Sequence, residues 1–134
     1  MGSVESGRPK RVTQLFIVTA VSESGAGLTL LVAPVAIIRL LFGSAVEFFP
    51  AAGIARLTGV ALLSLGAACW WARHDERSAA SRAILGAMLM YHGAVVVLVL
   101  FGGLGLLGPF QWAAVVLHGV QGIWSARVVA DRRR

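Results

Sequence analysis

Residues 83–101 read AILGAMLMYHGAVVVLVLF, an apolar run without a single charged side chain. A bilayer core about 30 Å thick needs about 20 such residues in a helix that rises about 1.5 Å per residue. Three further runs of similar length and polarity accompany it, at residues 12–33, 54–72 and 110–130. The sequence therefore predicts an all-α integral membrane bundle of four transmembrane helices.

The composition of the whole chain supports a membrane protein with one domain. Its 134 residues are 57% hydrophobic and 13% charged, whereas about 25% of the residues of a soluble domain are charged. A chain of this length cannot bury so much apolar surface in a water-soluble fold. We expect a single transmembrane domain at 12–130, between a cytoplasmic tail at 1–11 and a basic cytoplasmic end at 131–134.

The segment between the first two spans is shorter and carries a charge. Pro34 ends the first run, because proline lacks the N–H that a helix interior requires, and VAIIRLLF follows at 35–42. This segment is too short to cross the bilayer, and Arg39 interrupts it. We predict a short amphipathic segment that lies in the membrane interface.

Positive charge is concentrated on one predicted side of the membrane. Of the 12 Lys and Arg residues, all but Arg39 and Arg56 lie near the termini or in the loop between the second and third spans. Cytoplasmic loops are enriched in Lys and Arg, so we expect both termini in the cytoplasm of a multi-pass protein of the cell membrane. The net charge of +6 then reflects orientation and lipid headgroups, and no motif indicates nucleic-acid binding.

Four polar residues interrupt the spans at similar depth: Glu23 in the first, His92 in the third, and His118 and Gln121 in the fourth. The titratable three lie roughly 12–15 Å from the same side of the membrane. A central acidic residue costs about 2.5–3.5 kcal/mol in lipid and usually faces the bundle interior. We expect Glu23 to be neutral or paired with an imidazole, and to bond to neighbouring hydroxyl groups, those of Thr19, Ser22 and Ser24.

These residues leave several functions open. Interhelical hydrogen bonding would suit a protein that binds a partner protein or a lipophilic small molecule. Alternatively, His92 and His118 would be axial ligands of a haem, or would hold a metal ion with Glu23. Glu23, with Gln121 beside it, would otherwise be the site of a proton-coupled transporter; a lone acidic residue in the first of four short spans resembles the small multidrug-resistance transporters. The remaining alternative is an enzyme of lipid or quinone chemistry, for which the sequence offers no nucleophile or motif, and no catalytic residue is predicted.

Glycines within the spans predict helix–helix contacts, and two arginines predict contacts with lipid headgroups. Gly59 and Gly66, and likewise Gly86 and Gly93, are seven residues apart. Seven residues are nearly two helical turns, so each pair lies on one face, where small residues let membrane helices approach. Arg39 and Arg56, near the opposite interface, are candidates for contact with a lipid headgroup or a quinone, and the single cysteine, Cys69, excludes an intrachain disulfide.

Two segments resemble a known family. The segment ARLTGVALLSLGAACWWAR at 55–73 has an arginine, Arg56, at the entry of the span and glycines seven apart, and the proline-ended first span leads into RLLFG at 39–43. This layout resembles the DoxX-like group of small bacterial four-helix membrane proteins, and the resemblance implies that fold without supplying catalytic residues. Arginine-rich and alanine-rich usage is typical of a high-GC bacterium. We expect the bilayer as a partner, with a second membrane protein or a further copy of this chain.

Overall fold

The computed structural model describes residues 8–42, 49–75, 78–102 and 110–133. They form five helices: α1 (Arg8–Val32), α2 (Pro34–Phe42), α3 (Phe49–Ala72), α4 (Ala79–Gly102) and α5 (Gln111–Arg133). Four of these are long and apolar enough to span a membrane, over Arg11–Val32, Pro50–Ala72, Ala79–Phe101 and Gln111–Arg132. The predicted all-α architecture with four spanning helices is therefore confirmed.

Three of the four long helices, α1, α3 and α4, begin four or five residues before the predicted apolar runs, because hydrogen bonding rather than polarity sets the start of a helix. α1 begins at Arg8, so the predicted tail is helical from that residue, whereas residues 1–7 and Arg134 lie outside the described residues. α4 begins directly after Ser78, whose Oγ accepts a hydrogen bond from the backbone N–H of Ser81 at 3.0 Å. Such a cap satisfies one of the free N–H groups of the first helical turn.

The short helix predicted between the first two spans is α2. Pro34 separates α2 from α1, since it has no N–H to donate and fits the first turn of a new helix. Pro34 and Ile38 are buried against the bundle. At the other end of α2, the carbonyl oxygen of Leu40 accepts a hydrogen bond from the backbone N–H of Phe110 at 3.3 Å. This bond connects α2 to the start of α5.

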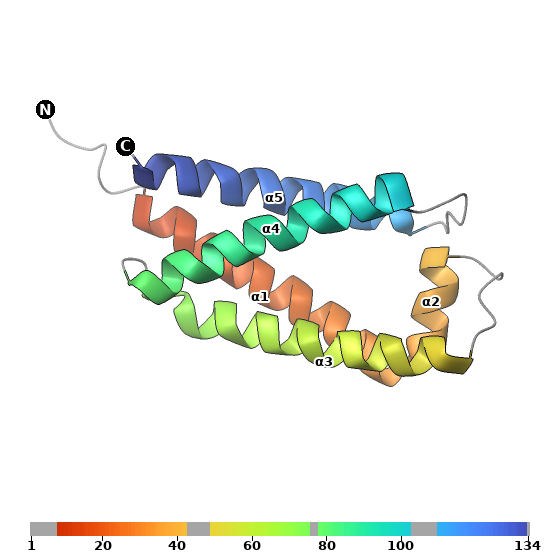
Figure 1. Cartoon of the computed structure of the whole chain (residues 1–134). Coiled ribbons are helices and arrows are strands. Elements are labelled where there is room, and N and C mark those ends of the chain that lie inside the picture. The colour runs from red at the N-terminus through yellow and green to blue at the C-terminus, as the bar shows by residue number, and fades with distance from the viewer. Residues whose placement is uncertain (1–7, 43–48, 76–77, 103–109, 134) are drawn as a thin grey trace, which may run out of the picture.

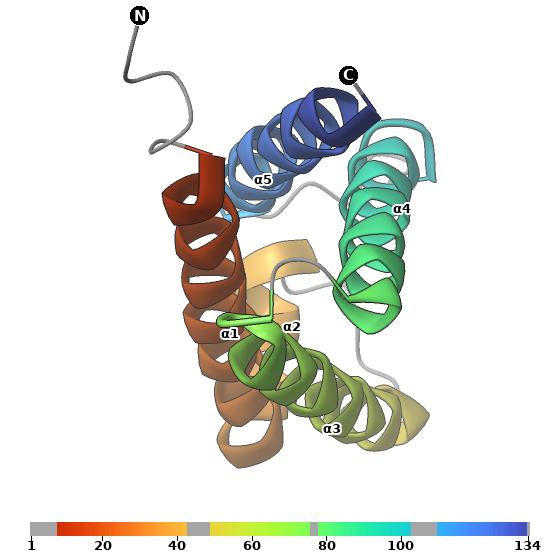
Figure 2. The ribbon, with the colours of Figure 1, turned by 90° about the vertical axis from the view of Figure 1, so that its left-hand side faces the viewer.

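The long helices form two pairs, α1 with α3 and α4 with α5 (Figure 1). Seen from the end that carries the termini, α1, α3, α4 and α5 surround a common axis (Figure 2). A buried apolar core near this end joins all four helices, through Val12, Leu15, Phe16 and Ala20 of α1, Cys69 and Ala72 of α3, Leu85 and Met88 of α4, and Val128 of α5. α2 lies across the opposite end.

One of the two predicted glycine faces makes a helix contact. Gly59 of α3 faces Gly27 of α1, so closely that a Cβ atom added at Gly27 would lie 2.6 Å from the backbone oxygen of Gly59. Gly66 meets Ser24 in the same way. The prediction for α4 is wrong: Gly86 and Gly93 are exposed, with no atom within 4 Å of an added Cβ. α4 packs against α5 with another face. The prediction failed because the spacing of glycines identifies a smooth helix face but does not show whether another helix packs against it.

The outer surface of the bundle is apolar. Large hydrophobic side chains face outward on α3 and α4, with exposed fractions of 77% for Trp71, 74% for Met90 and 79% for Phe101. Water-soluble monomers rarely expose apolar surface of this extent. Together with the four candidate spans, this surface makes the chain a multi-pass membrane protein.

Candidate functional site

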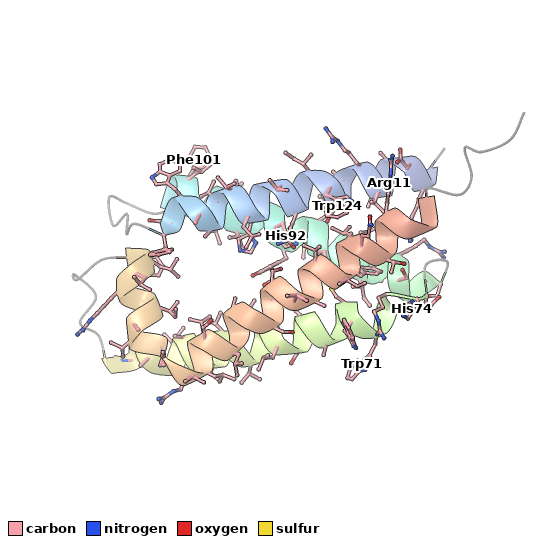
Figure 3. All side chains as sticks on the ribbon, turned by 180° about the vertical axis from the view of Figure 1, so that it is seen from behind. Arg11, Trp71, His74, His92, Phe101 and Trp124 are labelled. Atoms are coloured by element: carbon pink, nitrogen blue, oxygen red, sulfur yellow. The ribbon has the colours of Figure 1, made fainter. Side chains whose placement is uncertain are left out.

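Buried polar side chains gather where α1 crosses the α4–α5 pair. Thr19 and Glu23 of α1, His92 of α4 and Gln121 of α5 are each at most 2% exposed. His92 extends from α4 into the space between the helices (Figure 3). The prediction that polar groups of three spans share one depth is therefore confirmed by the contacts they make, which fall into two groups.

The first group consists of hydrogen bonds between α1 and α5. Thr19 Oγ1 donates to Gln121 Oε1 at 3.0 Å, and Gln121 Nε2 donates to Ser22 Oγ at 3.2 Å. Ser22 Oγ also lies 3.1 Å from the backbone oxygen of Thr19, to which it donates. Both ends of the Gln121 amide are thus satisfied, and these bonds hold α1 and α5 at a fixed rotation.

Thr19 and Ser22 therefore bond to Gln121 and not to Glu23, contrary to the sequence-based expectation. Ser22 and Ser24 adjoin Glu23 in the helix and therefore point about 100° away from it. Thr19 lies one turn earlier on the same face as Glu23, but its hydroxyl donates to Gln121 instead. The third expected hydroxyl, that of Ser24, lies against Gly66 of α3. The local sequence shows which hydroxyl groups lie near Glu23, whereas the way the helices cross decides which acceptor each hydroxyl group reaches.

The second group consists of Glu23, Tyr91, His92 and His118. Tyr91 Oη donates to Glu23 Oε2 at 3.1 Å. The Nδ1 atoms of His92 and His118 lie 2.9 Å apart, so that one ring donates and the other accepts. The Tyr91 ring meets the His118 ring edge to face, with centroids 5.5 Å apart. A carboxyl, a phenol and two imidazoles are thus in one contiguous cluster.

Sequence reasoning missed Tyr91. It is the only tyrosine of the chain and stands directly before His92. Consecutive residues of a helix point about 100° apart, since one turn holds 3.6 residues, which argues against a shared site. Both side chains nevertheless reach the cluster, since Tyr91 bonds to Glu23 of α1 while His92 meets His118 of α5. The sequence did contain one indication of its role: Tyr91 is a phenol within an apolar span, and buried tyrosine hydroxyl groups usually have a hydrogen-bond partner.

Glu23, His92 and His118 have the composition of a metal site. Their potential ligand atoms all lie within 4.8 Å of one another. Among the described residues, no hydrogen-bond partner reaches His92 Nε2, although that atom is buried. His118 is only half-buried, so the cluster is not sealed from the surface of the chain. Two imidazoles and one carboxylate from three helices can bind a divalent transition metal ion.

A haem held by both histidines does not fit this arrangement. Axial ligands bind the iron from opposite faces of the porphyrin, whereas the two Nδ1 atoms are in direct contact at 2.9 Å. The ring centroids are 5.2 Å apart and the planes are tilted by 39°. No room for a macrocycle exists between the two rings.

The other candidate residues lie away from the cluster. Arg39 of α2 and Arg56 of α3 are exposed, at the end of the bundle that α2 crosses. Cys69 is buried in the apolar core as a free thiol. Sequence reasoning did not single out three further buried side chains, Ser81, Gln111 and Ser125, whose oxygen atoms have no partner among the described residues.

Comparison with known proteins adds no relative: no protein-family model, no curated protein and no solved structure matches the chain.

Proposed function

We propose that this chain is a small membrane protein that binds a divalent transition metal ion through Glu23, His92 and His118, without catalytic machinery of its own. The observation that carries the proposal is the convergence of three ligating side chains, from α1, α4 and α5, with ligand atoms within 4.8 Å of one another. Ionisable residues inside a membrane are costly and usually functional. A metal ion accounts for all three at once.

The distances support the proposal quantitatively. Zinc–nitrogen bonds of about 2.0–2.1 Å at a tetrahedral angle separate two ligand nitrogens by about 3.3 Å. The Nδ1 atoms of His92 and His118 lie 2.9 Å apart, so the rings need to separate by about 0.4 Å, the difference between these values. The ligand atoms of all three residues lie within 4.8 Å of one another, so the farthest pair needs to approach by at most roughly 1.5 Å on the same geometry.

Tyr91 completes the site by orienting the carboxylate. Its hydroxyl donates to Glu23 Oε2 and leaves the other carboxylate oxygen for a metal ion. Hydrogen bonds of this kind typically change metal affinity 10- to 100-fold when they are removed. Three protein ligands also leave a fourth position of a tetrahedral ion open to water or to a transported or sensed molecule.

The test is metal binding by the purified full-length chain in detergent. The protein is stripped with a chelator, loaded with Zn²⁺ or Co²⁺, and analysed by elemental mass spectrometry, with Co²⁺ absorbance as a report of coordination. We expect one ion per chain, lost in His92→Ala and in His118→Ala. His74→Ala is the matched control, because His74 is exposed and lies outside the cluster, and it should keep the ion.

A metal-free protein under these conditions would refute the proposal and leave the cluster as interhelical hydrogen bonding, in a protein that binds a membrane partner, a further copy of itself or a lipophilic molecule. A haem band in the absorbance spectrum would refute it as well. Proton-driven uptake of a solute into vesicles, abolished by Glu23→Gln without any metal, would instead support the proton-coupled carrier.

The orientation and setting are part of the proposal. We propose that both termini and the α3–α4 connection face the cytoplasm of a bacterium, with the chain in its cell membrane and related to the DoxX-like group. The bias of Lys and Arg supports this orientation, and α1 begins at the end of the bundle where α3 and α5 end (Figure 1). On this orientation Arg39 and Arg56 contact lipid headgroups of the opposite leaflet.

A further inference from the structure

A groove separate from the Glu–His–His cluster runs between α1 and α5 at the end of the bundle that carries the termini. It has a volume of about 640 Å³, and its walls include Arg11 of α1 and Val120, Trp124, Arg127 and Asp131 of α5. Arg11 lies at this end of the bundle, and Trp124 lies deeper, toward the middle of the helices (Figure 3). From Val120 to Asp131 the groove follows α5 for roughly 16 Å, at about 1.5 Å per residue.

The groove changes character along its length. Val120, Ile123 and Trp124 form its apolar part, which lies within the α5 span of Gln111–Arg132. Arg11, Arg127 and Asp131 form its charged part, at the start of the α1 span and the end of the α5 span. A molecule that fills both parts has an apolar body at acyl-chain depth and a polar head at the membrane surface. Phospholipids have this shape.

The charged part favours a negative headgroup. Two guanidinium groups face one carboxylate there, which leaves a net positive charge. Arg11 Nη1 and Asp131 Oδ2 are 3.8 Å apart, and their side chains are 67% and 47% exposed. An exposed pair at this distance is weak, so a phosphate can replace Asp131 at Arg11. Arginine suits that exchange, because its planar fork binds phosphate through two parallel hydrogen bonds.

We propose that this groove binds one anionic phospholipid, with the phosphate between Arg11 and Arg127 and an acyl chain along Val120, Ile123 and Trp124. Basic recesses between membrane helices bind anionic lipid headgroups in this way. On the orientation given above, the groove opens to the cytoplasmic leaflet, where anionic lipids are enriched. The groove does not share a residue with the metal cluster, so either proposal can fail without the other.

Native mass spectrometry of the full-length chain in detergent tests the proposal, with phosphatidylglycerol and phosphatidylcholine of identical acyl chains. We expect one phosphatidylglycerol to bind more tightly than phosphatidylcholine. Each basic residue near an anionic surface contributes about a fivefold change in affinity. The double variant Arg11→Gln, Arg127→Gln should therefore bind phosphatidylglycerol about 25-fold more weakly.

The matched control is Arg73→Gln, Arg82→Gln, which removes the same charge from the ends of α3 and α4 outside the groove. This control should keep the preference, and Asp131→Asn should strengthen phosphatidylglycerol binding by removing the competing carboxylate. Unchanged labelling of the buried Cys69 thiol in each variant verifies the fold. Equal binding of both lipids, or the same weakening in both double variants, would overturn the proposal.

Discussion

The contact between α1 and α3 is the place where one added methyl group has the largest predicted effect. In Gly27→Ala, the new Cβ atom would lie 2.6 Å from the backbone oxygen of Gly59 and 2.9 Å from the backbone nitrogen of Leu63. Ordinary contact begins at 3.4 Å. The two backbones must therefore separate by about 0.8 Å, the difference between these distances, because neither neighbour is a flexible side chain.

This separation removes close packing, on which membrane helices depend in place of the hydrophobic effect. Overpacking of a well-packed site costs about 1–3 kcal/mol. Each 1.4 kcal/mol is a tenfold change in an equilibrium constant, so the unfolded fraction of Gly27→Ala should rise about 5- to 150-fold. Gly66→Leu, on the same face of α3, should be at least as destabilising, since Ser24 and the backbone of Ala20 occupy the space beside Gly66.

Cys69 supplies the assay. It is the only cysteine, and it is buried in the core between α1, α3, α4 and α5. Its reaction with a thiol-specific dye, followed across a titration with sodium dodecyl sulfate, reports the fraction of open molecules when opening is fast relative to labelling. The dye should react with Gly27→Ala at a lower detergent fraction than with the wild type.

The control is Gly86→Ala, because an added Cβ there has no atom within 4 Å. Alanine is also the better helix former by up to about 1 kcal/mol, so this variant should be as stable as the wild type or slightly more stable. Wild-type labelling of Gly27→Ala, or equal destabilisation by both substitutions, would refute the close approach of α1 and α3.

Three further predictions concern the polar cluster and the orientation. Thr19→Val removes a hydrogen bond between α1 and α5 and should destabilise the bundle by about 0.6 kcal/mol, at most about 1.7, in the same labelling assay; Thr58→Val, which loses only a bond within its own helix, should not, and equal effects would contradict the role of Gln121. Tyr91→Phe should keep the fold but weaken Co²⁺ binding 10- to 100-fold, and unchanged affinity in a competition titration would remove Tyr91 from the site. A cysteine introduced at Ser78 in a Cys69→Ala background should react with a membrane-impermeant reagent only from the cytoplasmic side, and one at Gly105, outside the described residues, only from the other; the reverse pattern would overturn the topology.

Part of the candidate site was predictable from the sequence. Glu23, His92, His118 and Gln121 are conspicuous because polar groups are costly in lipid, and the helical rise alone gives their similar depth. Their partners were not predictable. Tyr91 rather than a neighbouring hydroxyl donates to Glu23, and Gln121 bonds to Thr19 and Ser22. These choices depend on how each helix is rotated about its axis, which depth does not specify.

The sequence by itself determined the four spans, the helix break at Pro34 and a composition too apolar for a water-soluble fold. Those properties are local, since bilayer thickness sets the length of an apolar run and proline removes a backbone hydrogen bond from the helix in which it stands. Only the tertiary structure decided that Gly27, Gly59 and Gly66 lie in a helix contact while Gly86 and Gly93 face outward. Apart from the buried polar residues, the side chains of these helices are apolar enough for lipid on every face, so hydropathy does not tell which glycine-bearing face is buried. Backbone fit between particular helices makes that choice, and with it brings a carboxyl, a phenol and two imidazoles from three helices into one cluster.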